Sequence, residues 1–386
     1  MNMQKPAPAL THAVDSAPMG SFALPPPRAS RPSPGAAAEV NAEPLVHSFG
    51  EASAARPTWP VLLMLFLAML ALAAGSLFVG YVDMGPARLL QGAWAGDLVP
   101  SRILVDIRLP RTVLCLAVGA TLGLTGAAMQ GLLRNPLAEP GLLGISSGAA
   151  LGAVAALYTG VANAFYLALP LAGFAGTAAA CVFVFLLAGH HSSRTTLILG
   201  GVAVSALCGA LISLILNWST NPMAMSEIVF WMMGSLADRS NNDVILALPF
   251  MLAGCALLLT CGTALQALAL GEETAHSMGV DLRQLRIKIM IGCALAVGAA
   301  VSVSGSIGFI GLVAPHLMRR TAGGDPARLL PLSALAGATL LLLADLGVRL
   351  LYNSGQELKL GVLTSLVGAP FFIALILRSR KNAHDQ

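Results

Sequence analysis

The polar residues with the most suggestive spacing lie between two long apolar runs, in the segment LALGEETAHSMGV at residues 268–280. Glu272 and Glu273 directly follow Gly271, and Gly279 comes shortly after them. Carboxylates favour the first turn of a helix, where the helix dipole is positive. Glycine readily adopts the left-handed conformation that ends a helix. The segment therefore predicts one short, self-contained helix between two membrane spans.

A second group of polar residues is three arginines next to apolar runs. Arg108 and Arg111 bracket Leu109-Pro110, and Arg349 follows Asp345 by one helical turn. A guanidinium group can hold a carboxylate through two parallel hydrogen bonds, so one role open to these arginines is to bind a carboxylate. The alternative is that these arginines anchor the chain at lipid headgroups, with Asp345 and Arg349 as a local i,i+4 ion pair.

Other chemistry has little support in the sequence. No GxxxxGK[ST] phosphate-binding loop occurs, and none of the four lysines follows a glycine. The six cysteines lie in apolar runs without CxxC spacing, and the pair His190-His191 and His316 have no third ligand near them in sequence. We expect no catalytic residue, no cofactor and no metal site in this chain.

The composition shows what must position these residues. The 386-residue chain is 56% hydrophobic and only 10% charged, whereas soluble domains carry about 25% charged residues. A span needs about 20 apolar residues, and the sequence predicts ten spans in an all-α polytopic membrane protein. They lie near residues 61–81, 112–133, 142–159, 164–189, 196–217, 243–263, 287–303, 305–319, 329–350 and 360–377.

Several predicted spans are broken or lined with small residues. We expect helix breaks at Asn135, Pro136, Pro140, Gly305 and Pro315, because proline removes a backbone donor. Such breaks persist in a membrane when they are packed inside protein or line a watery path. Gly119 and Gly123 form a GxxxG pair that allows close approach of another helix. The stretches 126–136 and 305–315 form a faint repeat that five spans would invert, as in alternating-access transporters.

The first part of the chain has a different composition. Residues 1–56 are rich in Pro, Ala and Ser, which predicts a disordered cytoplasmic tail before a membrane domain at 57–386. A regulatory or contact role is the alternative to a dispensable tail. More Lys and Arg residues fall on the cytoplasmic side when both termini are placed inside, so we expect that orientation.

Five ordered blocks of sequence resemble the permease subunits of binding-protein-dependent ABC importers for iron-siderophores, haem and vitamin B12, the FecCD family. The resemblance covers roughly residues 61–378 and is carried by RLPR with RNPLAEPGLLG (108–111 and 134–144), WMMGSL (231–236), LALGEETAHSMGV (268–280), SGSIGFIGLVAPHLMR (304–319) and LGVLTSLVGAPFF (360–372). It implies a ten-helix fold like that of the vitamin B12 permease, a homodimeric pore in the bacterial inner membrane, two ATP-binding subunits that carry ATP and magnesium, and a periplasmic binding protein.

The resemblance also implies roles for particular residues. The short helix would be the segment that couples to the ATPase, through Gly271, Glu272, Glu273, Ala275 and Gly279. The binding protein would dock at Arg108, Arg111 and Arg349. Arg194 and Thr195 fall where the family's vitamin B12 member has small hydroxyl residues at its cytoplasmic gate, and the arginine departs from that pattern.

Substrate and mechanism follow from the same comparison. The ends of the blocks look more like the iron-chelate members, with vitamin B12 as the alternative cargo. An ion-coupled secondary transporter is the competing class. It is disfavoured because ionisable residues are nearly absent from the predicted spans, so no proton or sodium relay is visible.

Overall fold

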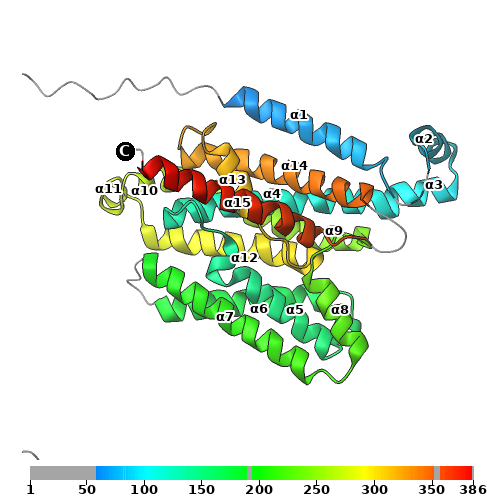
Figure 1. The fold of residues 1–386 in the computed structure, drawn as a ribbon, viewed down its shortest axis with the longest axis horizontal. Helices are drawn as coiled ribbons and strands as arrows, with labels where there is room; N and C mark the ends of the chain where they lie inside the picture. Colours follow the sequence, from blue (N-terminus) through cyan, green and yellow to red (C-terminus); the bar gives the residue numbers. More distant parts are fainter. Residues whose placement is uncertain (1–57, 81, 83, 189–193, 352–356, 385–386) are drawn as a thin grey trace, which may run out of the picture. The chain divides into compact units, whose positions relative to one another are not determined.

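A computed structural model describes residues 58–384 except 81, 83, 189–193 and 352–356. The expected tail at 1–56 lies outside the described residues. All regular structure in the described part is helical (Figure 1). The long helices are α1 (Trp59–Ser76), α4 (Leu109–Leu133), α6 (Ala168–Ala188), α7 (Arg194–Trp218), α9 (Asn241–Leu259), α12 (Leu282–Ser304), α14 (Pro326–Leu350) and α15 (Leu360–His384).

Shorter helices connect or flank them. They are α2 (Pro86–Ala95), α3 (Leu98–Arg102), the π-helix η1 (Ile103–Arg108), the 3₁₀ turn η2 (Pro140–Leu143), α5 (Ile145–Tyr158), the 3₁₀ turn η3 (Val161–Asn163), α8 (Pro222–Met232), α10 (Gly262–Ala269), α11 (Glu272–Ser277) and α13 (Ile310–Met318). Six of these lie outside the ten predicted spans, namely α2, α3, η1, η3, α8 and α11, and α10 overlaps only the last residues of the span predicted at 243–263.

Each of the ten predicted spans overlaps one helix, but the helices differ in length. Seven helical segments of the described chain are long and apolar enough to cross a membrane. The helix α5 has 14 residues and α13 has nine, which at 1.5 Å per residue is too short for a bilayer core about 30 Å thick. The spans predicted at 142–159 and 305–319 are therefore partial, because helix breaks take up their first residues.

The first break separates α4 from α5 as the sequence predicts. Arg134 adopts a left-handed conformation at the end of α4, with φ of 48°. The side chain of Asn135 then accepts a hydrogen bond from the backbone of Leu137 at 2.9 Å, and Pro140 begins η2. This connection is an irregular segment that leads into α5.

The second break begins at Gly305, as the sequence predicts, but it does not extend to Pro315. Gly305 ends α12 with a φ of 66°, and α13 begins after Phe309, which is left-handed with a φ of 67°. Pro315, expected to be a break, lies inside α13 instead. The break predicted at Gly305 is therefore present, and the break predicted at Pro315 is not.

The faint repeat predicted from the stretches 126–136 and 305–315 has no residue-by-residue match in the structure, because Gly126 lies within α4 whereas Gly305 ends a helix.

Close contacts between small residues hold the long helices together. A Cβ atom added at Gly119 or Gly123 of α4 would collide with the backbone of α14 at Gly337 or Ser333. The predicted GxxxG contact is thus present, between α4 and α14. Such packing matters because lipid tails are as apolar as leucine, so that van der Waals fit, more than a hydrophobic force, drives helices to associate.

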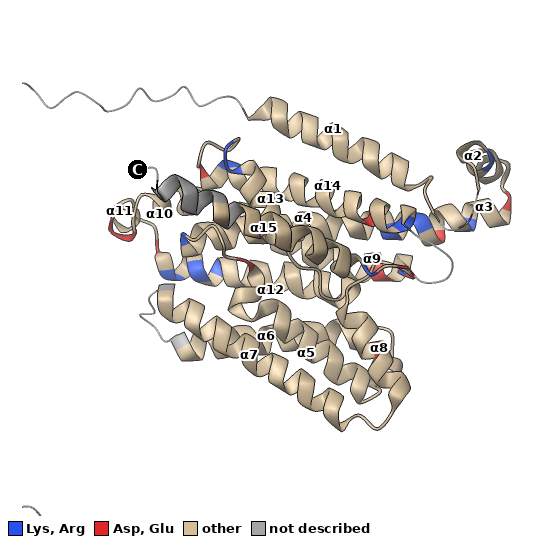
Figure 2. Ribbon diagram, in the orientation of Figure 1, with Lys and Arg blue, Asp and Glu red and all other residues tan. Residues whose placement is uncertain are grey.

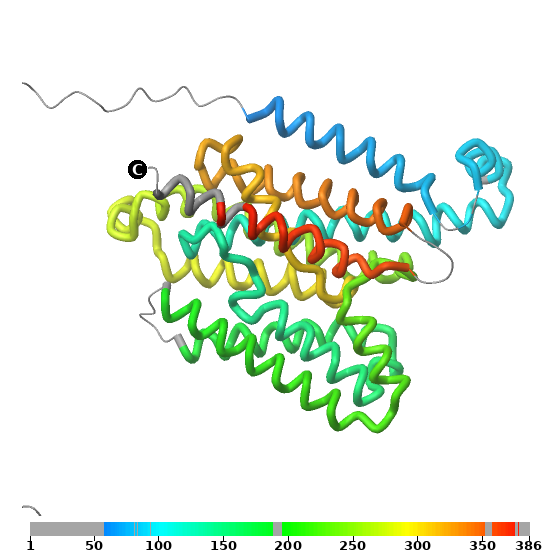
Figure 3. The backbone as a smooth tube through the Cα atoms, viewed as in Figure 1, coloured from blue at the N-terminus to red at the C-terminus, as the bar shows by residue number. Residues whose placement is uncertain are grey.

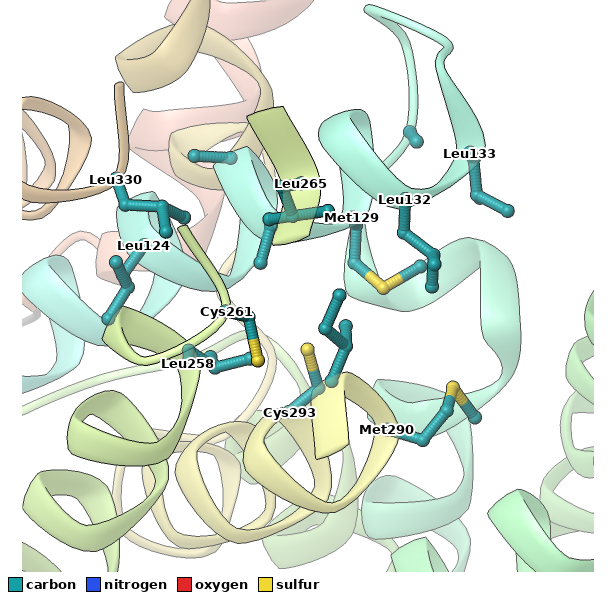
Figure 4. Close-up of a cluster of buried hydrophobic side chains, with 14 of the residues drawn as sticks. Leu124, Met129, Leu132, Leu133, Leu258, Cys261, Leu265, Met290, Cys293 and Leu330 are labelled. Atoms are coloured by element: carbon teal, nitrogen blue, oxygen red, sulfur yellow. The ribbon is translucent and has the colours of Figure 1, made fainter. Parts of the chain in front are cut away.

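Larger apolar side chains fill the space among α4, α9, α10, α12 and α14 (Figure 4). Leu258, Leu265 and Cys293 are fully buried there, next to Cys261 and Met129. All six cysteines are free. They therefore act as small apolar side chains, as their place in the apolar runs indicates.

Charged side chains gather towards the two ends of the long helices and leave their middle portions almost uncharged (Figure 2). One group lies where α3, α4 and α14 meet, and the other lies around α11 and the start of α12. The tube in Figure 3 shows that the chain runs back and forth between these two ends. This distribution is the one expected of helices that cross an apolar layer.

Candidate functional site

The expected short helix is present as α11, and both of its ends depend on glycine. Gly271 before it has a φ of 127°, and Gly279 after it has a φ of 81°. The amide of Gly279 donates to His276 at 2.9 Å, and the amide of Val280 donates to Ala275 at 3.0 Å. These two bonds form a Schellman motif, in which a left-handed residue satisfies the last carbonyls of the helix.

The helix α11 is fixed on one side and exposed on the other. Ala275 is fully buried, and Glu272 forms an ion pair with Arg286 of α12 at 4.0 Å. Glu273 and His276 are exposed, as is Met278, with 62% of its surface accessible. The arrangement presents an acidic and apolar surface at one end of the helices, suited to contact with a protein.

The three arginines lie together at the opposite end, but they are buried. Their exposed fractions are 4% for Arg108, 7% for Arg111 and 6% for Arg349. Arg111 donates to Asp345 through Nε at 3.0 Å and through Nη2 at 2.7 Å, and it also pairs with Glu357. Arg349 pairs with the same Asp345 from one turn away. The local i,i+4 pair expected as an alternative is therefore present.

The same arginines also bind backbone carbonyls around the end of α1. Arg349 donates to the carbonyl oxygen of Ser76 at 2.9 Å, and Arg108 donates to that of Leu77 at 2.9 Å. The last carbonyls of a helix have no partner within the helix and carry its negative dipole end. The arginine cluster thus fastens α1 to α4 and α14.

This placement differs from the exposed docking surface that the sequence suggested. Because Asp345 is fully buried, a cation must neutralise it within the fold, and two of the arginines do so. Sequence spacing showed the Asp345–Arg349 pair, but it could not show that Arg111 and Glu357 come to the same place from distant segments. Docking of another protein by these arginines stays a prediction.

The expected gate residues lie at the start of α7. Thr195 is exposed in the first turn of this helix. The side chain of Arg194 lies outside the described part of the chain, as do His190 and His191. A gate at this position stays a prediction. The described residues hold no group of three or more His, Cys, Asp and Glu side chains that could bind a metal ion.

A cavity between the two helix breaks, lined by both polar and apolar side chains, was not predicted from the sequence. It has a volume of about 440 Å³. Glu139, Ser146 and Ser147 line it from the first break and the start of α5, and Ser306 with Phe309 lines it from the second break. A carboxylate inside RNPLAEPGLLG was a usable signal, because ionisable residues within apolar segments are rare and usually functional.

Comparisons with known proteins extend over most of the chain. The model of the FecCD transport family matches residues 63–378. The chain is 41% identical to the hemin transport system permease protein HmuU of Yersinia pestis, over 82% of this chain and 95% of that protein. It is 38% identical to the vitamin B12 import system permease protein BtuC of Vibrio vulnificus, over 84% and 96%.

Two further similarities agree with these. An uncharacterized ABC transporter permease protein of Bacillus subtilis, YvrB, is 44% identical over 75% of this chain and 82% of its own length. Among solved structures, a transporter assigned to the metal-chelate type of ABC transporter, in an inward-facing conformation, superimposes with a TM-score of 0.75. It is 33% identical and covers 83% of this chain and 99% of its own.

Proposed function

The chain belongs to the FecCD transport family of ABC transporter permeases, and from this premise we propose that it carries an iron chelate, a siderophore complex or haem, into the cell. The observation that supports this cargo most directly is the 41% identity to a hemin transport permease along nearly the whole of that protein. The structural similarity to a transporter assigned to the metal-chelate type also supports an iron chelate as the cargo.

ATP hydrolysis takes place on a separate subunit in this proposal, since the sequence has no phosphate-binding loop. The surface of α11 is the proposed contact with that subunit. It is a rigid turn of helix held by Gly271 and Gly279, with Glu273 and Met278 exposed. A rigid element transmits movement from one subunit to another better than a flexible loop does.

The remaining parts of the assembly are a second copy of the chain, a periplasmic binding protein and the bacterial inner membrane, with both termini in the cytoplasm. The excess of basic residues on one side supports this orientation. Arg108 and Arg111 lie at the start of α4, and Arg349 lies in the last turn of α14. These helix ends are opposite to α11 (Figure 2), at the periplasmic end in this orientation. For these arginines to dock the binding protein, their guanidinium groups must exchange partners within the chain for carboxylates on that protein.

Vitamin B12 is the second candidate cargo, because several vitamin B12 (cobalamin) import permeases are 38 to 40% identical to this chain. Transport by an ion gradient without ATP is the competing mechanism. This mechanism needs groups that relay protons or sodium ions, and the long helices carry few ionisable residues in their middle portions (Figure 2).

Uptake by proteoliposomes tests both points. The chain is reconstituted with its ATPase subunits and binding protein, and radiolabelled ferric siderophore, haem and cobalamin are offered separately. We expect ATP-dependent accumulation of one of the two iron chelates and none driven by a proton or sodium gradient. Accumulation of cobalamin instead would select the alternative cargo, and uptake without ATPase subunits would overturn the assignment.

A further inference from the structure

The cavity of about 440 Å³ lies where four separate segments of the described chain meet. The two helix breaks contribute Glu139 and Ser306, and the side of the cavity is formed by Leu122 of α4 and Val202 of α7. Ser306 and Gly308 also line a neighbouring open groove along α15.

The polar groups that line the cavity have unused hydrogen-bonding capacity. The carboxylate of Glu139 makes no hydrogen bond or ion pair within the described residues, and neither do the hydroxyls of Ser146, Ser147 and Ser306. Ser205 is different, because its hydroxyl donates to the carbonyl oxygen of Gly141 at 3.0 Å. A partly buried carboxylate without a cation is unfavourable for the fold itself, so the fold gains nothing from Glu139 at this position.

We propose that Glu139, with the hydroxyls of Ser146, Ser147 and Ser306, forms a contact site for the cargo inside the permease, selective for cargo that presents an ammonium group or another strong hydrogen-bond donor. The proposal rests on the transport function proposed above and specifies the chemistry of the cargo. Glu139 is the one charged side chain among the residues that line the cavity.

The size and charge of the cavity favour this class of ligand over others. A volume of about 440 Å³ lies within the range of small-molecule sites, so the cavity can hold a side arm of a chelate. A cargo that places a carboxylate here would be repelled by the negative charge of Glu139. A cargo that places a hydrogen-bond donor here could donate both to Glu139 and to the serine oxygens. Burial raises the pKa of Glu139, so binding a cation there restores an interaction that the carboxylate lost when it left water.

Equilibrium binding to the permease with its ATPase subunits in lipid nanodiscs, without binding protein, tests the site. The probes are an iron trihydroxamate with a free terminal ammonium group and the same chelate with that amine acetylated, both labelled with radioactive iron. We expect the ammonium form to bind about tenfold more tightly, as a hydrogen bond to a charged group implies. In Glu139→Gln, which keeps the shape and removes the charge, the two forms should bind equally.

Two further variants make the result specific. Glu139→Asp keeps the charge and should retain part of the preference, while Glu227→Gln removes an exposed carboxylate of α8 and should leave it unchanged. Equal or absent binding of the two probes by the wild type, or a preference that survives in Glu139→Gln, would overturn the site. Transport is measured separately. ATP-driven uptake together with equal binding of the two probes would contradict the cargo site but not the proposed transport function. Tighter binding of the ammonium probe without ATP-driven uptake would contradict the transport function but not the site.

Discussion

Arg111 of α4 and Asp345 of α14 are 234 residues apart in sequence, and their side chains meet through three hydrogen bonds, at 3.0 Å, 3.3 Å and 2.7 Å. Asp345 also pairs with Arg349, so one buried carboxylate holds two guanidinium groups. Both arginines are in turn bound elsewhere, Arg111 to Glu357 and Arg349 to the carbonyls of Ser76 and Val79. Asp345 is therefore the partner that these two arginines share where α1, α4 and α14 meet.

Asp345→Asn should destabilise the protein, because it leaves two buried guanidinium groups with one negative charge fewer. Breaking a buried ion pair costs about 3–5 kcal/mol. Thermal unfolding in detergent measures the effect, with Asp238→Asn as the control, since Asp238 is exposed and asparagine tolerates its left-handed backbone. Equal melting temperatures for the two variants would show that the cluster contributes little to stability.

The arginines of the cluster should be poorly accessible to reagents. We expect an arginine-directed dicarbonyl to modify the exposed Arg88 and Arg102 much faster than Arg108, Arg111 and Arg349, as measured by mass spectrometry of digested protein. Rapid modification of all five would mean that the cluster opens in solution. Protection of the buried three on addition of the binding protein would then support docking at this place.

Gly123→Ala should weaken the contact between α4 and α14, because the added methyl group collides with the backbone of Ser333. Backbone cannot move aside as a flexible side chain can, and overpacking of this kind costs about 1–3 kcal/mol. Gly75→Ala in α1 is the matched control, since a Cβ there meets nothing within 4 Å. We expect a lower melting temperature in detergent for the first variant, and a result in which both behave like wild type would contradict the close packing.

Gly279→Val should uncouple transport from ATP hydrolysis while membrane insertion stays normal. A β-branched residue is strained at a φ of 81°, so the Schellman motif that ends α11 should be lost. Gly279→Asn tolerates this conformation better and should retain most of the activity. The measurements are co-purification with the ATPase subunit and ATP-driven uptake, and full activity in Gly279→Val would remove α11 from the coupling contact.

Glu139→Gln should raise the stability of the protein at neutral pH, and the gain should shrink as the pH falls. Burial raises the pKa of Glu139 above that of an unfolded glutamate, so the folded state binds the proton more readily than the unfolded state does. Stability from this group is then fully present below the unfolded pKa and is lost as the pH rises through the folded pKa. Melting temperatures of both proteins across pH check the sign, and a gain that grows towards low pH would contradict it.

Local features of this fold were predictable because they depend on neighbouring residues. The apolar runs predicted where ten helices lie, and Gly271 and Gly279 predicted where α11 begins and ends. Of the two breaks predicted after α12, Gly305 ends that helix, but Pro315 lies inside α13, because the chain already turns at Gly305 and Phe309 before α13 begins. Interactions between distant segments were not predictable: nothing near Arg111 in sequence indicates Glu357, and nothing near Glu139 indicates Ser306.

The link between Arg349 and the end of α1 has a consequence for the order in which the protein is made. Arg349 lies 273 residues after Ser76, so at the usual 5–20 residues per second it is synthesised roughly 14 to 55 s later. During that interval α1 is in the bilayer without its later partner. Its mean hydropathy of 2.1 makes this possible, because α1 can remain in lipid as a single helix until α14 arrives and the arginine secures its end.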